Sequence, residues 1–242
     1  MILKKQIGDN LQDINTRIAD ACVRAGRARN EVTLIAVSKM NPAEVVLAAA
    51  ECGQTVFGEN KVQELKSKQE EISSLYKQAA KDLEWHLIGH LQTNKVKDVV
   101  GRVKMIHSVD SLKLAEVIDR ESAKKGMISD ILLEMNVSGE ESKFGLSPEG
   151  LFAIIDEISG FHAIKVRGLM TVAPYTSDPE TNRIYFRKMK DLSVDISSKN
   201  IDNISMDVLS MGMTGDFEVA IEEGATHIRV GTGIFGARDY SK

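Results

Sequence analysis

Apolar residues recur at spacings of three and four along the first 21 positions of the chain. The apolar positions are Leu3, Ile7, Leu11, Ile14, Ile18 and Ala21, with mostly polar residues between them. This period is typical of an amphipathic α-helix that packs one face against a core. Gly26 suits a C-terminal stop, so we expect a leading helix within residues 1–27.

Short apolar runs of β type begin after residue 32 and alternate with helical patterns. The expected strands are residues 33–37, 55–57, 84–88, 105–107, 131–136, 165–169, 207–209 and 227–230. The expected helices are residues 42–50, a stripe from 62 to 79, and 94–100, 111–124, 147–158, 179–196 and 215–222. Ser111 and Ser147 precede two of these helices and are good N-cap residues.

Strict alternation of β and α units indicates a parallel sheet. Eight units in a chain of 242 residues predict a closed (β/α)8 barrel of the TIM type over residues 32–236. With the leading helix, we expect one domain over residues 1–242. The alternative is an open doubly wound sheet, which commonly carries a glycine-rich turn after its first strand. Residues 38–42 read Ser-Lys-Met-Asn-Pro instead.

Composition narrows the classes of function. The net charge is −4 and no basic stripe is present, so we expect no nucleic acid partner. No apolar stretch reaches the roughly 18 residues of a membrane span, and residues 1–10 lack a signal-peptide pattern. The two cysteines, Cys22 and Cys52, lack any metal-ligand spacing, so we expect reduced thiols in a cytoplasmic protein.

A lysine stands just after the first expected strand. Side chains alternate along a strand, so Lys39 projects to the same side as Ile35 and Val37. If that side faces a core, burial lowers the lysine pKa, and the neutral amine can form a Schiff base with a carbonyl compound. A lysine at a strand end more often extends into solvent, so a Schiff-base role for Lys39 needs evidence from other parts of the chain.

That support comes from two glycine-rich segments after the last two expected strands. Residues 210–216 read Ser-Met-Gly-Met-Thr-Gly-Asp and residues 231–236 read Gly-Thr-Gly-Ile-Phe-Gly. Loops after strands seven and eight of such barrels often hold phosphate. Small residues let backbone N–H groups approach an anion, and hydroxyls add donors. Each segment alone could be a turn, but their joint position predicts a phosphate site.

Arg229 adds a cation to the same face of the last strand. It lies two residues before Gly231, and its guanidinium has donors only. Its acceptor could be a carboxylate such as Glu134, or a heteroaromatic nitrogen of a bound ligand. A lysine amine, a phosphate site and an inward arginine together predict a site for pyridoxal 5′-phosphate (PLP).

Six segments carry a resemblance to a known family. They are residues 34–39 (LIAVSK), 57–64 (FGENKVQE), 85–95 (WHLIGHLQTNK), 167–170 (RGLM), 210–213 (SMGM) and 229–232 (RVGT). Each is weak alone, but together they are specific. On these segments the chain resembles the pyridoxal phosphate homeostasis proteins, relatives of the alanine racemase barrel domain. The resemblance extends from the leading helix to residue 240.

The resemblance implies roles for ten residues of this chain. Lys39 would form an internal aldimine with PLP, Arg229 would donate to its pyridine nitrogen, and Asn60 would lie near its ring hydroxyl. The phosphate would be held in the segments containing Ser210, Met211, Gly212, Gly231 and Thr232, and His86 and Met170 would line the pocket.

The resemblance also implies a PLP store without catalysis, which limits free PLP and delivers it to apo-enzymes, and we expect a monomer. Because arginine cannot accept a proton, the pyridine nitrogen would stay unprotonated and the ring would be a weaker electron sink. A PLP-dependent racemase is the alternative, with Tyr175 or Tyr240 as a conceivable proton donor. A third possibility is a barrel enzyme that forms a Schiff base with a sugar phosphate and uses no cofactor.

Three further features of the sequence bear on metal binding and on the rim of the site. His86 and His90 have the spacing of a zinc-binding helix, but the intervening Leu87 and Ile88 provide no glutamate, so we expect no metal. His107, His162 and His227 are expected to be packing or hydrogen-bonded residues. Residues 139–145 follow the fifth expected strand and form a polar segment at the rim of the site, whose role stays open.

Overall fold

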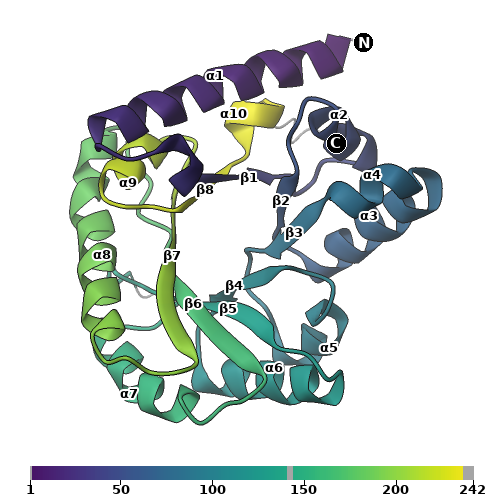
Figure 1. Cartoon of the computed structure of the whole chain (residues 1–242). Helices are drawn as coiled ribbons and strands as arrows, with labels where there is room; N and C mark the ends of the chain where they lie inside the picture. Colours follow the sequence, from purple (N-terminus) through teal and green to yellow (C-terminus); the bar gives the residue numbers. More distant parts are fainter. Residues whose placement is uncertain (1, 141–143, 237–242) are drawn as a thin grey trace.

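The computed structural model of the chain describes residues 2–140 and 144–236 (Figure 1). Eight parallel strands form a closed barrel in chain order. They are β1 (Thr33–Val37), β2 (Val56–Glu59), β3 (Glu84–Leu87), β4 (Met105–Val109), β5 (Ser129–Glu134), β6 (Ile164–Met170), β7 (Ile204–Met213) and β8 (His227–Val230). Pairing of β8 with β1 closes the barrel, with Thr33 opposite His227. The barrel prediction is confirmed, and the open sheet is wrong.

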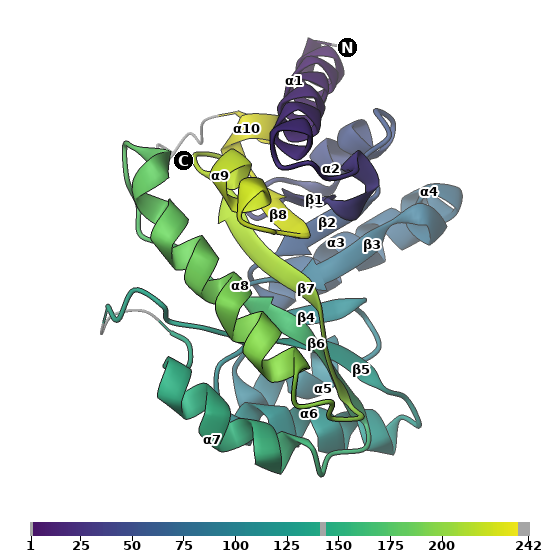
Figure 2. The ribbon, with the colours of Figure 1, turned by 60° about the vertical axis from the view of Figure 1, so that its left-hand side comes forward.

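Helices surround the barrel on its outside (Figures 1 and 2). Their bounds are α1 (Ile2–Arg24), α2 (Ala43–Ala50), α3 (Val62–Leu75), α4 (Lys77–Asp82), α5 (Val96–Val99), α6 (Leu112–Lys124), α7 (Pro148–Ile158), α8 (Arg183–Ser197), α9 (Phe217–Glu222) and α10 (Thr232–Phe235). Short 3-10 turns lie at Arg29–Glu31, Thr93–Lys95 and Pro179–Asn182. The hydroxyls of Ser111 and Ser147 accept backbone N–H bonds at the starts of α6 and α7, as expected for N-caps.

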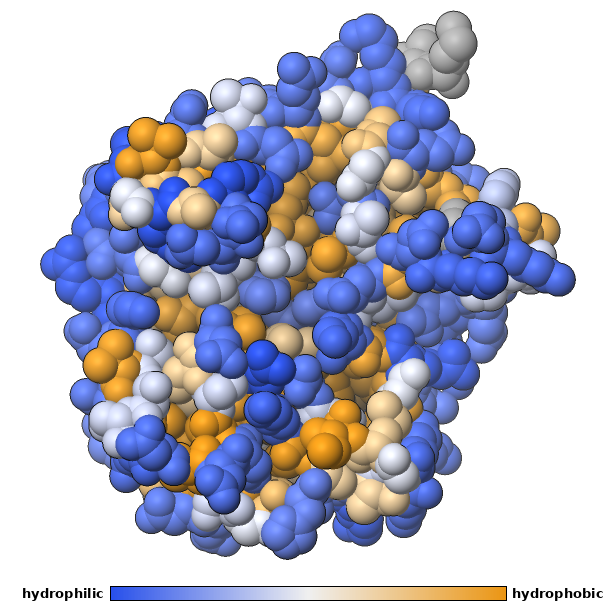
Figure 3. All heavy atoms as spheres, in the orientation of Figure 1, coloured by the Kyte–Doolittle hydropathy of each residue, from blue (hydrophilic) through white to orange (hydrophobic). Residues whose placement is uncertain are grey.

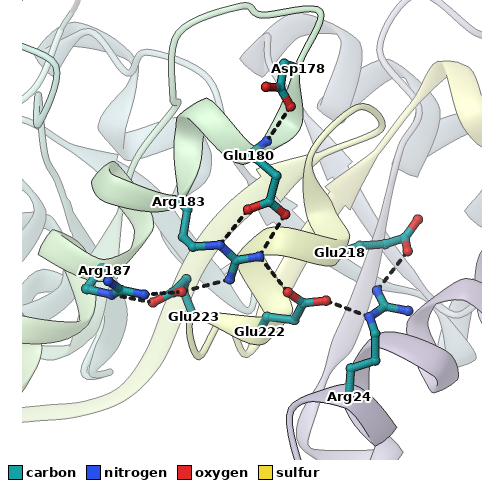
Figure 4. A network of polar contacts seen from close by, with 8 residues as sticks. All are labelled: Arg24, Asp178, Glu180, Arg183, Arg187, Glu218, Glu222 and Glu223. Carbon is teal, nitrogen blue, oxygen red and sulfur yellow. Dashed lines mark hydrogen bonds and ion pairs between the residues drawn. The ribbon is translucent and has the colours of Figure 1, made fainter.

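The leading helix α1 packs against the outside of the barrel. The expected apolar stripe is buried from Ile7 to Ala21, whereas Leu3 is exposed. At its end, Arg24 pairs with Glu222 of α9 at 2.7 Å, and Glu222 also pairs with Arg183 of α8 at 2.7 Å (Figure 4). This network joins α1 to α8 and α9, which lie near the other end of the sequence.

Several element boundaries differ from the prediction. The expected loop at 210–213 continues β7, because Ser210 pairs with Met170 on one side and Met213 pairs with Arg229 on the other. Most of the segment 231–236 is the short helix α10. The stripe from 62 to 79 is two helices, since Tyr76 leaves the helical conformation at φ −135° and ψ 55°.

The surface seen along the view of Figure 1 is mainly polar over the outer helices, with apolar side chains between them (Figure 3). In the part of the chain that the structure describes, no helix is both long and apolar enough to cross a membrane.

Candidate functional site

A cavity of about 640 Å³ opens at the carboxyl ends of the strands. Side chains that follow β1, β2, β3, β6, β7 and β8 contribute to its wall. The lining residues are Val37, Lys39, Asn60, Ile88, Val172, Pro174, Tyr175, Thr176, Asn182, Met213, Thr214, Gly215, Asp216, Arg229, Gly231 and Thr232. This is the end at which barrel enzymes bind their ligands, and the volume suits a small molecule.

Lys39 lines this cavity next to Val37. It stands two residues beyond the end of β1, and Ile35 and Val37 on the same side of the strand are buried. The strand alternation that predicted an inward lysine therefore agrees with the geometry. The next residue, Met40, adopts a positive φ of 63°, which turns the chain away from the strand direction.

Arg229 reaches the cavity from β8 and is almost completely buried. Its Nη1 donates to Ser210 Oγ at 2.5 Å and its Nη2 to the Thr171 carbonyl at 2.7 Å. Burial lowers the pKa of Arg229 to about 10, so the guanidinium is still a cation at neutral pH. Within the described residues no ion pair joins Arg229 to Glu134, the carboxylate that the sequence offers as its acceptor, although the charge of Glu134 acts against the fall in the Arg229 pKa. Burial raises the pKa of Glu134 to about 7.

Asn60 lines the cavity, and its side chain carries an unsatisfied polar atom. Its Oδ1 is buried and has no hydrogen-bond partner among the described residues. A buried acceptor of this kind is costly unless a donor reaches it. Gly89 allows this position, because a Cβ there would lie 2.5 Å from the Asn60 carbonyl oxygen. The site therefore fits a ligand that carries a hydroxyl donor.

Hydroxyl and amide donors gather where β7 and β8 end. Thr232 Oγ1 donates to Thr214 Oγ1 at 3.3 Å, and both threonines line the cavity with Gly231. Small and hydroxyl-bearing residues at this point suit an anion such as a phosphate ester. The sequence predicts phosphate contacts from the first residues of the 210–216 segment, whereas its end, Met213 to Asp216, lines the cavity.

Five of the ten predicted residues lie outside this wall. Ser210 and Met211 are buried within β7, and Gly212 packs against α9. Met170 is buried in a small cluster with Met105, Leu132 and Val208, and His86 is buried below the cavity with its Nδ1 2.7 Å from Nε2 of His107. Their roles toward a cofactor stay predictions.

Residues outside the predicted cofactor contacts also lie at the site. Tyr175 lines the cavity and its side chain is fully exposed, whereas Tyr240 lies outside the described residues. No pattern predicted that residues 172–176 after β6 would form part of the wall. The ring of Phe144 stacks on His90 at 4.0 Å, and residues 141–143 of the rim segment lie outside the described part.

Comparison with known proteins first gives the class. Residues 10–239 match the family model described as alanine racemase, N-terminal domain. An alanine racemase from Clostridium difficile has the same fold, with a TM-score of 0.70 at 14% identity over 96% of this chain and 58% of that chain. The chain is thus a barrel of the alanine racemase type.

Curated relatives then give the family. The pyridoxal phosphate homeostasis protein of Aquifex aeolicus is 45% identical over 96% of this chain and 98% of that protein. The solved structure of PipY from Synechococcus elongatus, with PLP bound, has a TM-score of 0.82 at 34% identity, covering 95% of this chain and all of that one. The chain belongs to the pyridoxal phosphate homeostasis protein family.

Proposed function

We propose that the protein binds PLP in the cavity after β1, β2, β7 and β8 and acts in PLP homeostasis. The observation that carries the proposal is the meeting of Lys39, Asn60, Arg229 and Thr232 on one cavity wall. An amine, a buried unsatisfied oxygen, a guanidinium and a hydroxyl cluster match the aldehyde, ring hydroxyl, ring nitrogen and phosphate of PLP. The PLP-bound structure of the relative PipY supports the same ligand class.

Each residue has a separate task in this proposal. Lys39 would hold PLP through its amine, which can form a Schiff base with an aldehyde with loss of water. Arg229 donates toward the ring nitrogen, and Asn60 Oδ1 accepts from the ring hydroxyl. Thr232 and Thr214 donate toward the phosphate, together with backbone N–H groups of the glycine-rich turns.

The proposed role is storage and delivery rather than catalysis. PLP supplies an electron sink when its ring nitrogen is protonated, and a guanidinium cannot accept that proton. The names of the curated relatives also refer to homeostasis. Transfer of PLP to apo-enzymes is part of the proposal. The alternative is a racemase-like enzyme, which the presence of the Tyr175 phenol at the cavity favours.

Visible absorbance tests the proposal. Wild-type protein incubated with PLP and freed of excess ligand should keep a yellow band, and Lys39→Ala should lose it while keeping its circular dichroism spectrum. Lys113→Ala on the exposed face of α6 is the matched control and should stay yellow. A yellow Lys39→Ala protein would refute the proposed role of Lys39. Robust conversion of L-alanine to D-alanine, lost in Tyr175→Phe, would favour the racemase instead.

A further inference from the structure

A line of polar side chains crosses the barrel interior from its amino-terminal end to the cavity. Glu84 Oε1 lies 2.9 Å from His86 Nε2, and His86 Nδ1 lies 2.7 Å from His107 Nε2. His107 Nδ1 lies 2.9 Å from Ser210 Oγ, which accepts from Arg229 Nη1 at 2.5 Å. The two histidines, the serine and the arginine are buried, and they come from β3, β4, β7 and β8.

The chemistry of Arg229 and Glu84, at the two ends of this line, fixes the direction in which its hydrogen bonds are donated. A guanidinium can only donate, and an ionised carboxylate can only accept. The hydrogen bond from His86 lowers the pKa of Glu84, so this carboxyl is ionised at neutral pH. Since Arg229 donates to Ser210, the serine hydrogen goes to His107 Nδ1. His107 then donates from Nε2 to His86, which donates from its own Nε2 to Glu84.

Both histidines are therefore neutral and carry their hydrogen on Nε2. Burial is the main reason that the pKa of His107 lies well below its ordinary value, which agrees with a neutral ring. The reversed chain would require a proton on both nitrogens of His86. It would also leave the Ser210 hydrogen without an acceptor, because no other contact of that hydroxyl occurs among the described residues.

We infer that His86, His107 and Ser210 are positioning residues that hold Arg229 as an oriented donor at the cavity. Ser210 fixes Nη1 from one side, and the Thr171 carbonyl fixes Nη2 from another at 2.7 Å. A guanidinium held in this way loses little freedom when a ligand binds. The identity of the ligand in this inference rests on the proposed function, whereas the line of hydrogen bonds does not.

His107 is the residue that separates positioning from direct binding. It does not line the cavity, so its replacement removes no ligand contact that the structure shows. A merely structural histidine would affect stability alone. A positioning histidine also affects the mobility of Arg229 and the retention of the ligand at equal fold.

The first experiment needs no ligand. Nitrogen-15 NMR of labelled protein should show His86 and His107 as Nε2–H tautomers and Arg229 with slowly rotating Nη groups. In His107→Leu the Arg229 rotation should become fast, while His107→Gln, which keeps a donor and an acceptor, should preserve much of the restriction. The exposed His162→Gln is the control. The inference would be overturned by a cationic His107 or by a His107 that carries its hydrogen on Nδ1. It would also be overturned if the Arg229 Nη groups rotate as fast in wild type as in His107→Leu.

The second experiment measures PLP release after dilution. His107→Leu should release PLP about tenfold faster than wild type, the effect of one lost oriented hydrogen bond, with borohydride still trapping PLP on Lys39. Equal release from folded wild type and His107→Leu would contradict positioning. If wild type takes up no PLP, the proposed function fails, and the Arg229 rotation decides the inference alone. If the leucine variant does not fold, the rotation of the Arg229 Nη groups is compared between wild type and His107→Gln.

Discussion

A buried ion pair holds the backbone next to Lys39. Glu59 Oε1 accepts from the Ser38 hydroxyl at 2.7 Å and from Lys68 Nζ at 2.6 Å, and Lys68 also donates to the Ser38 carbonyl at 2.8 Å. All three residues are buried. Burial raises the pKa of Glu59, and the Lys68 ammonium acts against that rise. The pair therefore fixes the residue that precedes the proposed cofactor-binding lysine.

Lys68→Met tests this pair. Removal of the ammonium leaves a buried carboxyl without its cation, which costs about 3–5 kcal/mol of unfolding free energy. Chemical denaturation measures the loss, and Lys68→Met with Glu59→Gln should recover part of it. The partly exposed Lys66→Met on the same helix serves for comparison, because the pair of Lys66 with Asp98 is open to solvent on one side and should contribute about 1 kcal/mol or less. Equal stability of Lys68→Met and wild type would show that the pair does not hold this region.

The sequence identified those site residues whose position follows from the pattern of one strand alone. Lys39 and Arg229 follow from the alternation along β1 and β8, and both line the cavity. His107 could not be assigned a role, because its partners come from β3 and β7 and meet only inside the closed barrel. Tyr175 and Thr176 carry no local pattern that would place them at the wall.

At the scale of elements, β7 differs most from its prediction. Glycine and serine at 210–213 are typical of a loop, but ladder bonds to β6 and β8 extend the strand through them. Gly212 has a φ of 90°, and a Cβ there would lie 2.6 Å from the Ala220 Cβ of α9. The glycine thus serves the close packing of α9 on β7, while the segment also reaches the cavity at Met213.

Gly212→Ala should therefore destabilise the protein by about 2 kcal/mol or more, through backbone strain and the clash with α9. Gly215→Ala is a matched change three residues later, where a Cβ meets nothing within 4 Å. It should alter the unfolding free energy by less than about 1 kcal/mol. Thermal and urea unfolding of the two variants measure the contrast. Similar losses in both would contradict the packing role of Gly212.

The alternation of elements was predictable because each βα unit carries its own hydrophobic pattern. The boundaries of the elements were less predictable, since they depend on pairing with neighbouring strands and helices in the barrel. The expected helix at 94–100 is a 3-10 turn followed by the four residues of α5, and the break at Tyr76 was not visible in the apolar stripe. Local pattern thus predicts which elements form, and tertiary pairing determines where they end.

At the scale of the whole molecule, barrel closure brings distant residues together. Lys39 follows β1, whereas Arg229 and Thr232 belong to the last strand and the turn after it. Because β8 pairs with β1, these residues face one cavity despite some 190 positions between Lys39 and Arg229. The contacts of α1 with α9, including Arg24 with Glu218 and Glu222, lie on the outside of this closure (Figure 4).

The central claim is that this closure makes Lys39 the covalent attachment point for PLP. Reduction of the PLP-loaded protein with borohydride, followed by peptide mapping, tests it most directly. We expect one pyridoxyl group per chain, on Lys39, with no comparable modification of exposed lysines such as Lys113. A label on another lysine, or labelling spread evenly over the surface, would contradict the claim.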